Sequence, residues 1–235
     1  MFDWLANPNR FNKITEKIQP YILLIAITTL ISGLYFGLFD SPKDYQQGDA
    51  VRIMYIHVPT AWLASFLYFS LAISCVFYLV WKHPLADLVS SSIAPIGALF
   101  SVLTLVTGSL WGKPMWGTWW VWDARLTSVA ILFIVYLLII FLNQTFENRE
   151  VREKTIAIFI LIGSINLPII KFSVDWWNTL HQPASISKLS APTIDVSMLI
   201  PLFIMTAACF LFLVTVSLIR FRLVLIENKM LRTSN

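Results

Sequence analysis

Charged side chains are scarce in this sequence. Asp, Glu, Lys and Arg make up 13% of its 235 residues, which is about half of the roughly 25% found in soluble proteins. Hydrophobic residues make up 57%, and the mean hydropathy is +0.73. Too few polar side chains remain to solvate a soluble surface, which excludes a disordered chain and a free nucleic-acid-binding domain. The composition predicts an integral membrane protein with no nucleic-acid partner.

Cysteines and the common catalytic motifs are also nearly absent. The two cysteines, Cys75 and Cys209, lie inside apolar runs and form no CxxC or CxxCH pair; thiols in such places are more often small core residues than ligands. The patterns HExxH, GxSxG, GKS and GKT do not occur, so zinc-dependent hydrolysis, a serine hydrolase and ATP hydrolysis by this chain alone have no support. We predict no catalytic residues and a protein that is not an enzyme.

Six long stretches contain no charged residue. A helix crosses the hydrocarbon of a bilayer in roughly 20 residues, with about 17 as the usual lower limit. The fifth stretch, 155–170, has only 16 residues, but Lys171 can extend its ammonium group to the interface and the apolar run resumes at Phe172. We predict an all-α integral membrane protein with one domain, 1–235, and six transmembrane helices, near 18–39, 57–80, 89–110, 126–146, 155–171 and 196–219.

The basic residues divide unevenly between the two sides of this arrangement. With six helices, both termini share a side with the segments 82–87 and 143–154, and that side holds 11 of the Lys and Arg residues against 6 on the other. Basic residues concentrate on the cytoplasmic side of membrane proteins. We therefore predict that both termini are cytoplasmic and that three loops, near 40–52, 111–125 and 171–195, face outward.

Tryptophan is concentrated in two of the outward loops. An aromatic belt at the membrane interface is the usual explanation, but four Trp residues between positions 116 and 122 exceed what anchoring one loop requires. If this segment is helical, the spacing of positions 116, 119 and 120 places three rings on one face, and such a platform suits a large, flat, apolar ligand. Seven of the ten Trp residues belong to these loops: Trp111, Trp116, Trp119, Trp120, Trp122, Trp176 and Trp177.

Two of the three histidines map to the same side as these Trp residues. His57 begins the second span, where Pro59 fits a first helical turn, and His181 follows Trp177 in the third outward loop. His83 lies in a short turn on the opposite side. A single interfacial His is more often a packing residue than a ligand, but two that converge on an aromatic platform fit a planar iron porphyrin, because imidazole binds iron at either axial position.

Asp123 and Arg125 end the Trp-rich segment. Asp123 could cap the fourth helix and Arg125 could pair with it. Alternatively, both could belong to the ligand site. In that case Arg125, together with Arg52 and Lys113, could meet the propionates of haem.

Four strings within residues 54–181 carry a specific resemblance: MYIHVPTAW, WKHPLAD, GSLWGKPMWGTWWVWDARLTS and NLPIIKFSVDWWNTLHQ. They are similar to the haem exporter protein C (CcmC) family of the cytochrome c maturation system, in which WGTWWVWD corresponds to the tryptophan-rich WWD signature. The resemblance implies a subunit of an ABC transporter complex in the inner membrane of a bacterium or an organelle.

The same resemblance implies the ligand, the site and the partners. Haem b would bind on the periplasmic face with His57 and His181 as axial iron ligands, and would be loaded onto a periplasmic haem chaperone, CcmE. The complex would also contain the transporter subunits CcmA and CcmB and the small membrane subunit CcmD. The implied haem-binding residues are His57, His181, Trp111, Trp116, Trp119, Trp120, Trp122, Asp123, Arg125 and Arg52.

Two other functions compete with haem handling. A b-type haem electron carrier is the stronger alternative, but such proteins usually hold haem between histidines inside the helix bundle, whereas both candidate ligands here lie at or beyond the ends of spans. A small-molecule permease would need a charged or helix-breaking element at mid-membrane. Asn166 and Pro168 are the main candidates for that element, and a neighbouring helix is partner enough for them.

Overall fold

The computed structural model describes residues 8–82, 85–183, 185–186, 188 and 190–233, so His83 lies outside the described residues. Within them the chain is helical, with no strand. Six helices or helix pairs are long and apolar enough to cross a membrane, which confirms the predicted fold class. The elements are α1 (Pro8–Tyr35), the π-helix η2 (Phe36–Asp40), the 3₁₀-helix η3 (Asp49–Ile53), α2 (Met54–Trp81), α3 (Leu85–Trp116), α4 (Ala124–Thr145), α5 (Arg149–Gly163), α6 (Asn166–Trp176) and α7 (Val196–Thr233).

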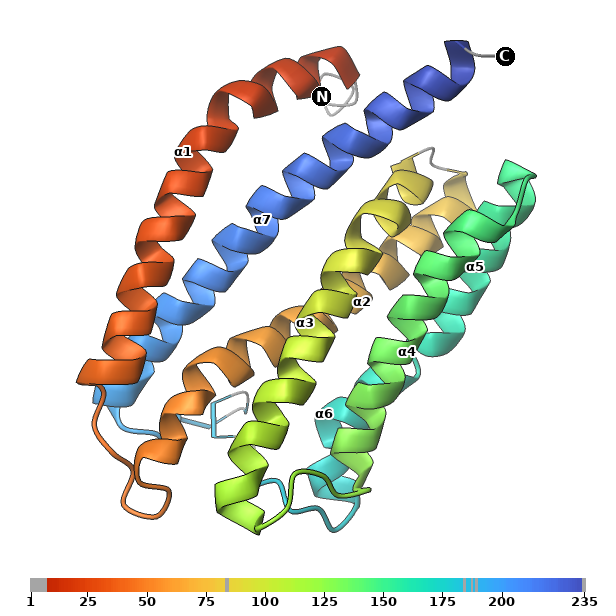
Figure 1. The fold of residues 1–235 in the computed structure, drawn as a ribbon. Helices are drawn as coiled ribbons and strands as arrows, with labels where there is room; N and C mark the ends of the chain where they lie inside the picture. The colour runs from red at the N-terminus through yellow and green to blue at the C-terminus, as the bar shows by residue number, and fades with distance from the viewer. Residues whose placement is uncertain (1–7, 83–84, 184, 187, 189, 234–235) are drawn as a thin grey trace.

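The helices form two groups (Figure 1). One is the pair α1 and α7, and the other contains α2 to α6; α7 also packs against α2 and α3. The start of α1 and the end of α7 lie at one end of the molecule, together with the end of α2, the start of α3 and the α4–α5 connection. The η2–η3 region, residues 117–123 and the segment after α6 lie at the other end. All three loops that were predicted to face outward therefore share one end, opposite the termini.

The fifth span consists of two helices. Pro168 has no N–H to donate to the carbonyl four residues earlier, that of Ser164, and its ring would clash with that carbonyl. The helix accordingly breaks between α5 and α6, at Ser164 and Ile165. The Asn166 side chain, which is buried, donates to the Ser128 carbonyl of α4 at 2.8 Å. Because α5 and α6 together run from Arg149 to Trp176, the span extends past Lys171 as expected and is long enough to cross.

Two buried tyrosines fill notches left by glycines on neighbouring helices. Tyr136 of α4 packs against Gly97 of α3, and Tyr68 of α2 packs against Gly163 of α5, so closely that a Cβ atom on either glycine would overlap the tyrosine. The hydroxyl of Tyr136 donates to the Ala64 carbonyl at 2.7 Å, and the rings of the two tyrosines meet edge to face at 5.3 Å. Four helices are thus joined through one pair of side chains.

Labelling with a membrane-impermeant thiol reagent tests this topology. Asn178 and Glu147 are exposed at opposite ends of the molecule, and the native Cys75 and Cys209 are buried. We expect Asn178→Cys to react from the outside of intact cells and Glu147→Cys to react only after the membrane is permeabilised. Ser173, although in the same segment as Asn178, is fully buried and is unsuitable as a probe. Protection of Asn178→Cys in intact cells would contradict the predicted orientation.

Candidate functional site

His57 lies in the first turn of α2 and is fixed against α3. Its Nδ1 atom is 3.1 Å from the Thr107 hydroxyl oxygen, and that hydroxyl donates its own hydrogen to the Leu103 carbonyl at 2.6 Å. Thr107 therefore accepts from His57, which places the ring hydrogen on Nδ1 and leaves the lone pair on Nε2. The ring also meets Trp111 edge to face, with centroids 5.7 Å apart.

The position expected for Pro59 is wrong by one turn. The helix starts at Met54, directly after η3, so Pro59 is its sixth residue and lies inside the helix. The reason is that residues 49–53 already coil as a 3₁₀-helix and lead into α2 earlier than the apolar pattern indicated.

Gly108 provides the space that the His57 ring occupies. A Cβ atom at Gly108 would lie 3.0 Å from the Cε1 atom of His57, closer than ordinary packing allows. Thr107 and Gly108 are followed one helical turn later by Trp111 and Gly112, so the four residues lie on one side of α3. This face was not identified from the sequence, although the run TGSLWG carries its small residues.

Replacing Gly108 with alanine should displace the His57 ring and weaken any ligand bound through Nε2. Overpacking usually costs about 1–3 kcal/mol. We expect this cost to reduce both the free energy of ligand binding and the free energy of unfolding. Gly33→Ala is the matched control, because its Cβ would meet the Met205 sulfur at 2.9 Å in the α1–α7 pair. Ligand titration and thermal unfolding of both variants separate the two effects; equal affinities would contradict the assigned role of Gly108.

His181 is held by Asp123. The Nδ1 atom of His181 is 3.3 Å from Oδ2 of Asp123, and since a carboxylate only accepts, the ring hydrogen is again on Nδ1 and the lone pair on Nε2. The ring of His181 meets Trp116 edge to face at 4.9 Å. Burial lowers the pKa of His181 below its ordinary value and the Asp123 carboxylate opposes that shift, so the ring is neutral near pH 7.

Asp123 caps α4, which is one of the two roles weighed for it, and it also contacts His181. Its Oδ1 atom accepts from the Leu126 N–H at 2.7 Å and caps α4, while Oδ2 holds His181. The side chain is 8% exposed, so both contacts are shielded from water. One carboxylate thus links the start of a membrane helix to a loop histidine 58 residues further along the chain.

The two imidazoles come from distant segments of the chain, the start of α2 and the segment after α6, which lie at the same end of the molecule. Within the part of the chain that the structure describes, His, Cys, Asp and Glu do not gather in groups of three or more that could hold a metal ion. The available donors are therefore the two Nε2 atoms. A pair of neutral imidazoles suits a metal that is already held in a plane by another ligand.

The Trp-rich segment is not the helical face that its spacing suggested. Trp111 and Trp116 belong to α3, and residues 117–123 are irregular, so the segment outside a helix is shorter than the predicted loop 111–125. Gly117, with a φ of 76°, lies directly after α3, and the chain must then reach Asp123, which starts α4. Rings 116, 119 and 120 therefore do not share a helix face.

The aromatic rings of this segment meet at their edges. Trp120 and Trp122 are 5.4 Å apart with planes at 80°, and Trp119 lies under the Lys113 ammonium at 5.8 Å. Trp122 is 83% exposed. The Nε1 of Trp120 is buried and lacks a hydrogen-bond acceptor among the described residues, so it is a donor that remains to be satisfied.

The two arginines have different surroundings. Arg125 donates to the Ser173 hydroxyl at 3.1 Å and to the Lys171 carbonyl at 3.3 Å, which ties the start of α4 to α6 beside Asp123. Arg52 donates to the carbonyls of Leu38 and Ser41 and thereby braces the first loop, where Gln47 accepts from Trp111 at 2.9 Å. The charge of Arg125 acts on His181. The contacts of Arg52 are instead with Leu38 in η2, with Ser41 and with Asp49.

Comparisons with known proteins agree on one family. The family model described as "Heme exporter protein C" (CcmC) matches residues 1–234. The chain is 50% identical to the heme exporter protein C of Bradyrhizobium diazoefficiens over 93% of its own length and 82% of that protein. It is 46% identical to that of Haemophilus influenzae over 97% and 94%, and 53% identical to a putative cytochrome c biosynthesis ccmC-like mitochondrial protein of Marchantia polymorpha over 76% and 75%. The chain belongs to the haem exporter protein C family.

Proposed function

We propose that this protein binds haem between His57 and His181 on its outer face and passes it to a periplasmic acceptor. The observation that carries the proposal is that both imidazoles are held through Nδ1, by Thr107 and by Asp123, so that both Nε2 lone pairs remain for iron. Histidines that bind metals typically donate their other ring N–H to an oxygen in this way. The names of the relatives, heme exporter proteins, support the same ligand.

The surroundings of the histidines suit the rest of a haem molecule. Trp111 and Trp116 each contact one of the two imidazoles, and aromatic rings are good partners for a porphyrin. The buried N–H of Trp120 could donate to a propionate, and Arg125 could pair with one. Haem is here the cargo, and the residues of the chain bind it, orient it and shield it from water.

The position of the second ligand favours transfer over storage. His181 lies after the end of α6, outside the helices, so a movement of the loop would release one axial bond while His57, within α2, keeps the other. We infer that the acceptor is the periplasmic chaperone CcmE and that the protein works with CcmA, CcmB and CcmD, the set implied by the family. A b-type electron carrier would instead hold its haem permanently.

An absorption spectrum tests the proposal. The purified protein, titrated with haem b, should give the spectrum of low-spin iron with two imidazole ligands, and apo-CcmE added in excess should remove the haem. Retention of the haem in the presence of CcmE, together with reversible reduction, would favour the electron carrier. The absence of a two-imidazole spectrum at any haem concentration would rule out the axial assignment.

Trp120 should matter for haem retention both as a ring and as a donor. Trp120→Ala should weaken haem binding by about 1–3 kcal/mol, if base stacking on aromatic side chains is a guide, and Trp120→Phe, which keeps a ring but loses the N–H, should lie between it and the unaltered protein. Trp81→Ala is the matched control, since Trp81 is exposed at the opposite end of α2. Haem dissociation rates of the three variants provide the measurement; equal rates for Trp120→Ala and Trp81→Ala would contradict this role.

A further inference from the structure

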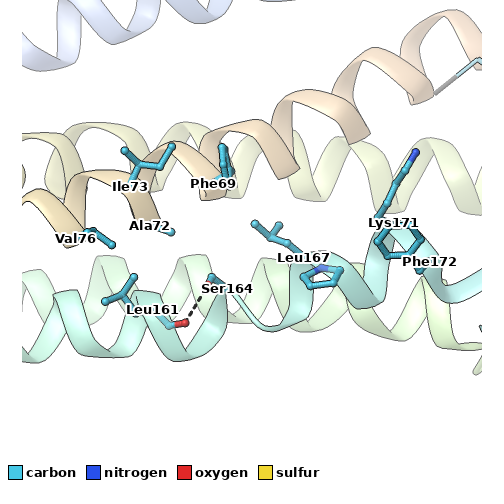
Figure 2. A pocket seen from close by; sticks show the side chains of 10 residues that line it. Phe69, Ala72, Ile73, Val76, Leu161, Ser164, Leu167, Lys171 and Phe172 are labelled. Carbon is cyan, nitrogen blue, oxygen red and sulfur yellow. Dashed lines mark hydrogen bonds between the residues drawn. The ribbon is translucent and has the colours of Figure 1, made fainter. Parts of the chain in front are cut away.

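A groove of about 560 Å³ runs along the outside of the bundle, away from the two histidines. Figure 2 shows its walls, which come from α2 on one side and from α5 and α6 on the other. The lining is almost entirely apolar, and at one end the Lys171 side chain extends from α6. The apolar walls include Ala72, Ile73, Val76, Leu161, Leu167 and Phe172.

The break in the fifth span accounts for the groove. The chain leaves the α5 helix at Ser164 and restarts as α6, which packs against α4, so the side of α6 that faces α2 is not filled by protein. The Ser164 hydroxyl is already satisfied, because it donates to the Leu161 carbonyl at 2.6 Å. The groove therefore offers an occupant apolar contact along its length and a positive charge at one end.

The groove has the depth of one leaflet of a bilayer. Its walls extend from Leu161 to Phe172. At the helical rise of 1.5 Å per residue this segment, which includes the break, is at most about 16 Å long, and half of the hydrocarbon thickness is about 15 Å. The lining residues Phe69 and Phe172 are 55% and 42% exposed in a span that lies within the membrane, so the groove opens toward lipid. Lys171 is at the end nearer the two histidines, where its ammonium can reach the interface.

We propose that the groove is a binding site for one phospholipid of the outer leaflet, with an acyl chain between α2 and α6 and the phosphate at Lys171. The acyl chain would fill the space that the break between α5 and α6 leaves open. Arg125 already donates to the Lys171 carbonyl and to the hydroxyl of Ser173, two residues later. The lipid therefore supports α6 on the side opposite α4 and steadies the helix that leads to His181.

Native mass spectrometry of the full-length protein in detergent tests this site, with palmitoyl-oleoyl phosphatidylglycerol as the probe. The delipidated protein should take up one tightly held molecule, and palmitoyl-oleoyl glycerol, which lacks the phosphate, should bind more weakly. Lys171→Gln should weaken phosphatidylglycerol binding about fivefold, the value of one basic residue at an anionic lipid surface. Lys113→Gln is the matched control, since Lys113 is a lysine at the same end of the molecule that contacts Gly117 and Trp119 instead.

Two variants block the groove. Ala72→Phe would fill it from a buried position, and Val76→Trp would fill it from an exposed one that is less able to disturb folding. Both should lose the tightly held lipid, and Val76→Trp should keep the thermal unfolding temperature of the unaltered protein, whereas Ala72→Phe should lower it because it overpacks a buried site. Lipid retention by both blocked variants, or equal binding by Lys171→Gln and Lys113→Gln, would overturn the proposal. The proposal would also be overturned if the groove bound no phospholipid and was occupied only by haem or by a helix of another subunit.

Discussion

Alanine at His57 or at His181 is expected to abolish the two-imidazole haem spectrum, because each substitution would remove one of the two proposed axial ligands. Thr107→Val and Asp123→Asn keep the shape of the supporting side chain but change what holds Nδ1; changes of this kind typically weaken metal binding about 10- to 100-fold. We therefore expect a graded series, in which the ligand variants lose more than the supporting variants. Haem titrations followed by absorbance measure both effects.

Two controls accompany this series. His83→Ala removes a histidine that the sequence places at the opposite side, and it should leave the spectrum unchanged. Added imidazole should restore the low-spin spectrum of His57→Ala, because a free ligand can enter the space left by the ring. If both ligand variants kept the spectrum of the unaltered protein, the axial assignment would be wrong and the iron would need other ligands.

Alanine at Gly97 or Gly163 should destabilise the whole bundle. A Cβ atom at either position overlaps a tyrosine, Tyr136 or Tyr68, and both rings are fully buried. Overpacking usually costs about 1–3 kcal/mol and occasionally more, and these substitutions should lie at or above the upper limit. The measurement is thermal unfolding in detergent, with the amount of protein that remains monodisperse recorded at each temperature.

A double-mutant cycle identifies the mechanism. Removing the Tyr136 ring together with the Gly97 change should cost less than the sum of the two single substitutions, because the overlap is then absent. Tyr136→Phe alone, which removes only the hydrogen bond to the Ala64 carbonyl, should cost about 1 kcal/mol. Additive costs for Gly97→Ala and Tyr136→Ala would mean that the notch does not determine how these helices pack.

The helices followed from the sequence because their signals are local. Apolar length located six spans, and the continuation past Lys171 was visible as the apolar run at Phe172. The cap of α4 by Asp123 was one of two alternatives, and in the structure it coexists with the contact to His181. The prediction that His57 and His181 bind haem remains a prediction; the structure places both at the same end of the molecule, each held through Nδ1.

The features of the site that the sequence did not predict depend on contacts between distant segments. Thr107 holds a histidine 50 residues earlier in the chain, and Ser173 accepts from an arginine 48 residues earlier; no local pattern marks either residue as part of a site. The helical face expected for the Trp residues failed because Gly117 and the need to reach Asp123 override a periodicity of three and four. Spacing alone carries no information on where a helix ends.

The divided use of the Asp123 carboxylate has a mechanical consequence. A carboxyl group whose two oxygens hold different partners cannot rotate to release His181 without also giving up the first turn of α4, and a helix cap is worth about 0.5–2 kcal/mol. Arg125, the second residue of that turn, is in addition tied to α6. Release of His181 and fraying of the first turn of α4 are thus one equilibrium. A protein that binds this turn would therefore change how His181 is held without touching the histidine.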